Sequence, residues 1–96
     1  MAQRLADGVT ISDATLAQIV VQAAESVEGA RVRRPRRGLE VSVADGKARV
    51  QLELALPYGA ILQEAGRAVQ ERVTAALREM CGLEAAAVDV AIEELA

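Results

Sequence analysis

The most constraining feature of the sequence is an alternating run that ends abruptly at a proline, an aromatic residue and a glycine. From residue 50 to residue 56, large apolar side chains alternate with polar or small ones, which is the period of a half-buried β-strand. Pro57 lacks the amide hydrogen that a strand donates to its neighbour, and Gly59 allows a sharp turn after Tyr58. A helical pattern begins at once. The run therefore predicts a strand followed directly by a helix.

A tight turn just before this strand predicts a β-hairpin. Asp45-Gly46 is a strong signal for a two-residue hairpin turn. Pairing outward from the turn sets Val43 against Ala48, Val41 against Val50, and Leu39 against Leu52. All of these apolar residues then fall on one face and the polar residues on the other. Because turn and pattern specify the same register, we expect the two strands to pair in this way.

Two segments have the spacing of amphipathic helices. The first is predicted over residues 13–28, with Ser12 as its N-cap and Gly29 as its stop. The second ends before Gly82, where Leu83 supplies the apolar contact of a C-terminal capping motif. Gly66 lies inside this second helix, which indicates a close approach of another backbone. The expected apolar face of the second helix comprises Ile61, Leu62, Ala65, Val69, Val73, Ala76, Leu77 and Met80.

Shorter extended segments complete the predicted fold. Residues 30–32 form a brief strand, residues 88–92 alternate as a final strand, and residues 8–11 add a short extended lead. The main elements follow the order α-β-β-β-α-β. Their economical packing is an α/β (α+β) fold in which two helices cover one face of a small mixed β-sheet. At 96 residues, the chain is predicted to be a single domain over residues 1–96.

The residues that usually carry enzymatic chemistry are scarce. The chain has no histidine, and its single cysteine, Cys81, lies at the predicted C-terminal end of a helix. There the helix dipole raises a thiol pKa and does not activate the thiol. We therefore interpret Cys81 as a small packing residue, and we predict no enzymatic activity, no catalytic residues, no cofactor and no metal site.

The sequence also shows no segment that would carry the chain into a membrane. No apolar run approaches the roughly 20 residues that span a bilayer, and no basic region followed by an apolar stretch opens the sequence. A lone cysteine fits a reducing compartment. We therefore expect a cytoplasmic protein whose membrane contact, if it has one, is peripheral or made through a partner.

An arginine run follows the first helix. Nearly half of the 11 lysines and arginines in a chain of net charge −3 are Arg31, Arg33, Arg34, Arg36 and Arg37. One interpretation is a site for anionic lipid headgroups, nucleic-acid phosphates or an acidic protein partner. The other is a solvated loop that offsets an acidic body. Nucleic acid is the less favoured partner, since no aromatic residues interleave with the arginines and the chain has no GXXG clamp of the KH type.

Tyr58 is the only aromatic residue of the chain, and it lies beside Gly59 at the boundary of two elements. As an interaction corner, this pair is a candidate recognition site. As a packing residue, Tyr58 would plug the core and leave its hydroxyl in water. The plug is favoured, because the core has no other aromatic side chain and the preceding strand directs Tyr58 toward the packing face of the second helix.

Several short pieces of the chain share their order and spacing with a known protein family. They are Gly8-Val9-Thr10-Ile11-Ser12, Val27-Glu28-Gly29-Ala30, Leu54-Ala55-Leu56-Pro57-Tyr58-Gly59, Val69-Gln70-Glu71-Arg72-Val73, and Met80-Cys81-Gly82-Leu83 leading into Val88-Asp89-Val90-Ala91-Ile92. Together these pieces resemble the alkaline shock protein family, small bacterial proteins of the envelope stress response. The resemblance extends over nearly the whole chain.

The resemblance implies an α/β domain without catalytic residues that acts as an interaction or scaffold protein in cell-envelope homeostasis. It also implies a protein partner, because some members are held at the membrane by a separate anchor protein. Some members are prone to self-assembly, so we expect a homo-oligomer formed through a sheet edge or a helix face. The chain departs from many members in having no long charged tail and in its arginine-rich loop. The alternative function is a small nucleic-acid-binding module that uses the Arg31–Arg37 loop.

Overall fold

The computed structural model describes residues 2–6, 9–33 and 39–95 of the chain. In chain order, its elements are β1 (Ala2–Ala6), β2 (Val9–Ser12), α1 (Asp13–Glu25), β3 (Arg31–Val32), β4 (Leu39–Ala44), β5 (Lys47–Pro57), α2 (Leu62–Cys81) and β6 (Glu84–Leu95). The predicted order from the first helix to the last strand is confirmed. Two N-terminal strands precede it.

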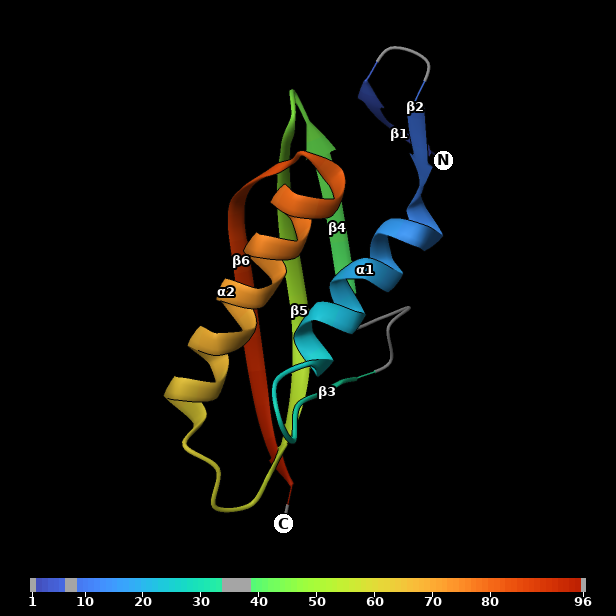
Figure 1. Cartoon of the computed structure of the whole chain (residues 1–96). Helices are drawn as coiled ribbons and strands as arrows, with labels where there is room; N and C mark the ends of the chain where they lie inside the picture. The colour runs from blue at the N-terminus through green and yellow to red at the C-terminus, as the bar shows by residue number, and fades with distance from the viewer. Residues whose placement is uncertain (1, 7–8, 34–38, 96) are drawn as a thin grey trace.

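β5 is the central strand of a four-stranded sheet (Figure 1). On one side, β3 and β4 pair with it in antiparallel orientation, and on the other side β6 pairs with it in parallel. Asp45 and Gly46 have φ values of 54° and 74°, which is the left-handed backbone of a primed hairpin turn. The predicted register is confirmed, with Val43 opposite Ala48, Val41 opposite Val50 and Leu39 opposite Leu52.

Both helices lie on the same face of this sheet (Figure 1), so the predicted mixed sheet with two helices on one face is confirmed. From Lys47 to Leu54, exposed and buried residues alternate along β5. One face of the strand therefore packs against the helices, and the other face is left open. The core between helices and sheet is aliphatic, and its largest fully buried side chains are Leu16, Leu54, Leu56, Leu77, Val20, Val50, Val69 and Val73.

β1 and β2 form a separate antiparallel hairpin that stands away from the four-stranded sheet (Figure 1). The sequence predicted only an extended lead over residues 8–11, of which Gly8 lies outside the described residues. β2 runs directly into α1, where the Ser12 hydroxyl accepts a hydrogen bond from the Thr15 amide at 3.1 Å. The predicted N-cap is thereby confirmed, and it joins the hairpin to the helix at a single residue.

α1 ends at Glu25, three residues before its predicted end. The Ser26 hydroxyl donates a hydrogen bond to the Ala23 carbonyl at 2.6 Å. This bond satisfies one of the carbonyls that a helix leaves unpaired at its C-terminus. Gly29, with a φ of 81°, takes up the left-handed conformation in the turn that follows, and not at the helix end itself.

α2 ends in the predicted capping motif. Gly82 has a φ of 66°, and the Leu83 amide donates to the Leu77 carbonyl at 3.0 Å. Two positions of the predicted apolar face are wrong, because Ile61 and Met80 are each 64% exposed. Ile61 precedes the first helical turn as its cap residue. At the other end, the buried stripe continues from Leu77 to the residue four positions later, which is Cys81, so Met80 faces outward.

Gly66 lies against a neighbouring strand, but through a side chain and not through the backbone that the sequence predicted. A Cβ atom added to Gly66 would lie 3.2 Å from Cδ1 of Ile92 in β6. The absence of a side chain at this point lets α2 lie close against the last strand. The contact brings α2 close to β6 at this point.

Candidate interaction surfaces

The turn between β5 and α2 forms one end of an elongated molecule of 47 × 22 × 17 Å (Figure 1). Pro57 ends β5, and the Ala60 amide donates to the Pro57 carbonyl at 3.1 Å, which closes the turn. Gly59 has a φ of 89°, and its amide donates to Oε2 of Glu94 in β6 at 3.3 Å. The turn is therefore attached to the ends of two strands.

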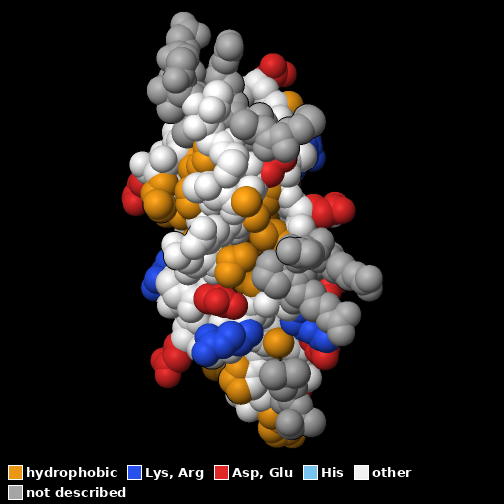
Figure 2. Space-filling view, turned by 90° about the vertical axis from the view of Figure 1, so that its right-hand side faces the viewer, with side chains coloured by type: hydrophobic (Ala, Val, Ile, Leu, Met, Phe, Trp, Pro, Cys, Tyr) orange, Lys and Arg blue, Asp and Glu red, His pale blue; other side chains and the backbone are white. Residues whose placement is uncertain are grey.

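Tyr58 projects from this turn into solvent. It is 78% exposed, and Ile61 is 64% exposed; we name these two residues the tip pair. The predicted plug is wrong. Pro57 ends the strand and Gly59 reverses the chain, so Tyr58 does not continue the alternation that would direct it to the core. Figure 2 shows apolar side chains at this lower end of the molecule, which makes the tip pair a candidate contact for a partner.

The arginine run is only partly described. Arg34, Arg36 and Arg37 lie outside the described residues. The Arg31 guanidinium donates to the Ala30 carbonyl at 3.2 Å, and Arg33 forms an ion pair with Glu93 of β6. The charge of Arg33 is therefore offset by a carboxylate of the same chain, while Arg31 remains exposed.

The ion pair of Arg33 and Glu93 connects the two sides of the sheet across β5. Backbone pairing extends beyond β3, because the Arg33 amide donates to the Glu53 carbonyl at 2.9 Å. Ala55 lies opposite Arg31 on one side and opposite Glu93 on the other. Ala55 is 6% exposed, although it belongs to the open face of β5.

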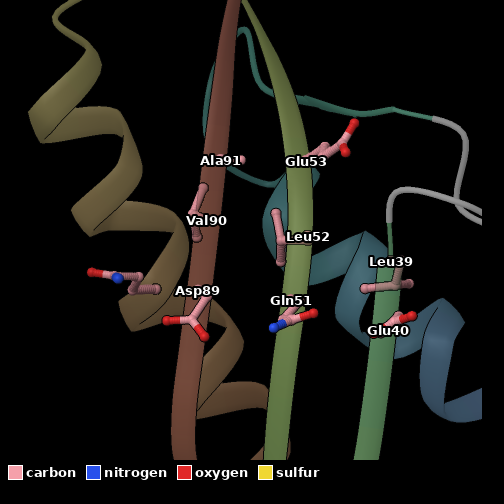
Figure 3. A pocket seen from close by; sticks show the side chains of 9 residues that line it. Leu39, Glu40, Gln51, Leu52, Glu53, Asp89, Val90 and Ala91 are labelled. Carbon is pink, nitrogen blue, oxygen red and sulfur yellow. The ribbon is translucent and has the colours of Figure 1, made fainter.

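A polar row crosses the open face of the sheet (Figure 3). The register places Glu40 opposite Gln51, and Gln51 opposite Asp89. With Glu53, these side chains line a shallow hollow of about 560 Å³. Sequence reasoning missed this row. The hairpin register alone pairs Glu40 with Gln51, but no sequence signal showed that the last strand runs parallel to β5 and brings Asp89 beside them.

The described residues offer little for catalysis or metal binding. Cys81 is buried among the core residues, so its interpretation as a packing residue is confirmed. Burial raises the pKa of its thiol, because the folded chain removes water that would solvate the thiolate. Across residues 2–6, 9–33 and 39–95, no group of three or more His, Cys, Asp or Glu side chains could hold a metal ion. In the same part of the chain, neither helix has the length and apolarity to cross a bilayer.

A comparison with protein families identifies the family of this chain. The model of the alkaline shock protein 23 family, described as having a cell envelope-related function, matches residues 30–96. The chain belongs to the alkaline shock protein family. The matched region of this family member includes the arginine run, the tip pair and β6. The resemblance drawn from the sequence is confirmed over residues 30–96, and the pieces before residue 30 lie outside the match. No curated protein matches the chain.

Solved structures similar to this family member include several forms of the MamM CTD. A copper form shares 21% identity, with a TM-score of 0.67 over 86% of this chain and 98% of that chain. A cadmium form shares 22%, with a TM-score of 0.68 over 86% and 96%. A nickel form shares 20%, with a TM-score of 0.68 over 86% and 99%. At these identities the likeness supports the fold and carries no information about ligands.

Proposed function

We propose that this member of the alkaline shock protein family is a non-enzymatic interaction protein that binds a protein partner through the tip pair at the cytoplasmic side of the cell envelope. The observation that carries the proposal is the exposure of Tyr58 at 78% and Ile61 at 64% on a turn bonded to two strands. Tyrosine supplies a large contact area at a small cost in conformational entropy. A turn that is already held in place loses little further freedom on binding.

The family supports the choice of partner. Its described function is cell envelope-related, and no helix within the described residues is suited to cross a bilayer. A membrane anchor protein that presents a complementary apolar pocket would bring the domain to the envelope. Self-association of the domain remains a second prediction, which light scattering over a range of concentrations tests directly.

The decisive experiment compares exposed apolar residues at the two ends of α2. Ile61 and Met80 are each 64% exposed, but only Ile61 belongs to the tip pair. We expect Tyr58→Ala and Ile61→Ala to abolish recovery of a membrane-protein partner from solubilised membranes, while Met80→Ala recovers it as well as wild type does. Equal recovery by all three variants would show that the tip pair is not the contact.

The alternative function, nucleic-acid binding, would require a different kind of surface. It requires several free cations to neutralise phosphates, whereas Arg33 is paired with Glu93. Among the described residues of the run, only Arg31 is an exposed cation without a carboxylate partner in the structure. We therefore retain nucleic acid as an outcome to be tested, together with anionic lipid, and not as a second proposed function.

A further inference from the structure

The strand β6 has one long edge that no other described strand covers. β6 contains 12 residues and pairs only with β5. It contains no proline, lysine or arginine, which are residues that commonly protect strand edges. An uncovered edge presents backbone donors and acceptors to any extended chain that approaches it.

The first half of the edge is protected in two ways. The pairing with β5 shifts by one residue where Ala48 faces Ala85 and Arg49 faces Ala87, so Ala86 forms a bulge that disturbs the edge. Beyond the bulge, Nε2 of Gln70 in α2 donates a hydrogen bond to the Val88 carbonyl at 3.0 Å. A side chain of the same molecule thus already occupies this acceptor.

Backbone groups of β6 alternate between β5 and the outer edge. The Glu84 amide points inward, because it donates to the Gly46 carbonyl at 3.0 Å. Counting past the bulge, the backbone groups of Val88 point outward, which agrees with the bond that its carbonyl accepts from Gln70. The same alternation directs the backbone groups of Val90, Ile92 and Glu94 outward.

The second half of the edge has no comparable protection. The carboxylates of Glu93 and Glu94 do not cover it, because they bind other groups of the chain. Glu93 forms an ion pair with Arg33, and Glu94 accepts a hydrogen bond from the Gly59 amide. No hydrogen bond between a described side chain and the outward groups of Val90, Ile92 or Glu94 is found. These three residues therefore form an open edge.

The first turns of α2 extend beyond this open edge. Figures 1 and 3 both show the start of α2 on the side of β6 that faces away from β5. Leu62 and Ala65 in these turns are half-buried, as are Val90 and Ile92 in β6. An added strand would therefore lie under the helix and could cover these four residues with its own apolar side chains.

The overhang of α2 also selects the occupant. If β6 of a second copy paired symmetrically with this edge, the two α2 helices would be brought to the same space above the joined strands. A single extended segment avoids this conflict. From Asp89 onward, the exposed charged residues of β6 are all acidic, namely Asp89, Glu93 and Glu94, and Glu93 is already paired with Arg33. Basic side chains on the segment would complement them.

We infer that the edge of β6 from Val90 to Glu94, under the first turns of α2, binds an extended segment of a partner protein as an added β-strand. The segment has alternating apolar and basic residues. Its apolar side chains face α2, and its basic side chains lie on the open face near Asp89. Backbone hydrogen bonds hold the segment, and the alternating side chains select it. This surface is distinct from the tip pair, and the inference does not depend on the proposed function.

The first test uses a synthetic peptide of about six residues in which valine alternates with arginine, a length that matches a typical strand. On binding, we expect the backbone amides of Val90, Ile92 and Glu94 to become protected from hydrogen exchange. A peptide in which valine alternates with glutamate should bind at least about tenfold more weakly, because the surrounding carboxylates repel it. Absence of protection at these amides, or equal binding of both peptides, would overturn the inference.

A matched pair of variants tests the backbone contact. Glu94→Pro removes an outward amide that β5 does not use, and an edge strand tolerates proline at such a position. Glu94→Ala removes the same carboxylate but keeps the amide. We expect Glu94→Pro to weaken binding of the valine-arginine peptide at least about tenfold relative to Glu94→Ala, with Tyr58→Ala binding as wild type does. Equal binding by the two Glu94 variants would refute strand addition. Concentration-dependent protection of the same amides without peptide would show that a second copy is the occupant.

Discussion

Gly29 lies directly against Pro57, so that a Cβ atom added to Gly29 would be 3.2 Å from Cδ of the proline ring. Gly29 also has a φ of 81°. The turn after α1 and the end of β5 therefore pack this closely because residue 29 has no side chain. This contact ties the segment that carries the arginine run to the strand that carries the tip pair.

The first prediction concerns this contact. Gly29→Ala should lower the free energy of unfolding by about 2–3 kcal/mol, from left-handed strain together with overlap on Pro57. Gly46→Ala is the matched control, because Gly46 has a similar φ of 74° but no atom within 4 Å of an added Cβ, so only the strain of about 1 kcal/mol remains. Urea denaturation measures both. Equal losses would show that Pro57 contributes nothing.

Gly66 and Ile92 should be energetically coupled. Gly66→Ala improves helix propensity by about 1 kcal/mol but forces Cδ1 of Ile92 to move. In the Ile92→Val background, which removes that atom, Gly66→Ala should raise the free energy of unfolding by about 1 kcal/mol, whereas in wild type the gain should be largely cancelled. A double-mutant cycle by urea denaturation tests this. The same effect in both backgrounds would mean that the close approach has no energetic consequence.

Tyr58→Ala should leave the fold intact. Because Tyr58 is 78% exposed, we expect its truncation to change the free energy of unfolding by less than about 0.5 kcal/mol. Leu54→Ala, which truncates a fully buried side chain, should cost about 2–5 kcal/mol. Thermal melts of both variants provide the measurement, and a large drop in the midpoint for Tyr58→Ala would restore the packing role.

The ion pair of Arg33 with Glu93 should influence how strongly the arginine run binds anions. Replacing Arg33, Arg34, Arg36 and Arg37 by serine should abolish any binding to anionic vesicles or DNA, and that binding should weaken steeply with salt. Glu93→Gln should strengthen it, because Arg33 is released from its partner, at a stability cost below about 1 kcal/mol. Vesicle and DNA titrations at the same salt concentration distinguish the two anions. If neither binds wild type or Glu93→Gln, the run is a solvated loop.

Cys81 should make stability depend on alkaline pH. Burial raises the pKa of its thiol in the folded state, so the unfolded chain ionises at a lower pH than the folded one. The resulting contribution to stability is fully present below the ordinary thiol pKa and is lost as pH rises through the raised pKa. The urea midpoint of wild type should therefore fall more steeply at alkaline pH than that of Cys81→Ala. Parallel pH profiles for the two proteins would contradict this.

The parts of the fold that the sequence predicted are those set by local chemistry. Asp45-Gly46 indicated the hairpin register, and Ser12 and Gly82 marked helix ends. Gly66 indicated a close contact, although with a backbone and not with the Ile92 side chain that lies there. The length of β6 was underestimated, because the small residues at 85–87 carry no alternating apolar signal. β1 was missed for a related reason, since residues 2–6 lack a clear period of two.

The surfaces were harder to predict than the elements. The position of Tyr58 at an element boundary was evident, but its direction depended on how Pro57 and Gly59 turn the chain. The partner of Arg33 lies 60 residues away in the sequence. Patterns of neighbouring residues do not predict contacts across such a separation. The open edge of β6 required knowledge of the parallel pairing with β5, which arises only from packing of α2 on the sheet.

The parallel pairing of β5 with β6 has a consequence for the order in which the molecule assembles. The β4–β5 hairpin is closed by a two-residue turn, so its contacts are local and form early. β6 reaches β5 only after α2 has crossed over the sheet, because parallel neighbours require a long connection. Until β6 docks, one side of β5 is unpaired and the apolar residues beneath α2 are uncovered. We therefore expect the docking of β6 to be a late step in folding, and the chain to be most exposed to aggregation before it.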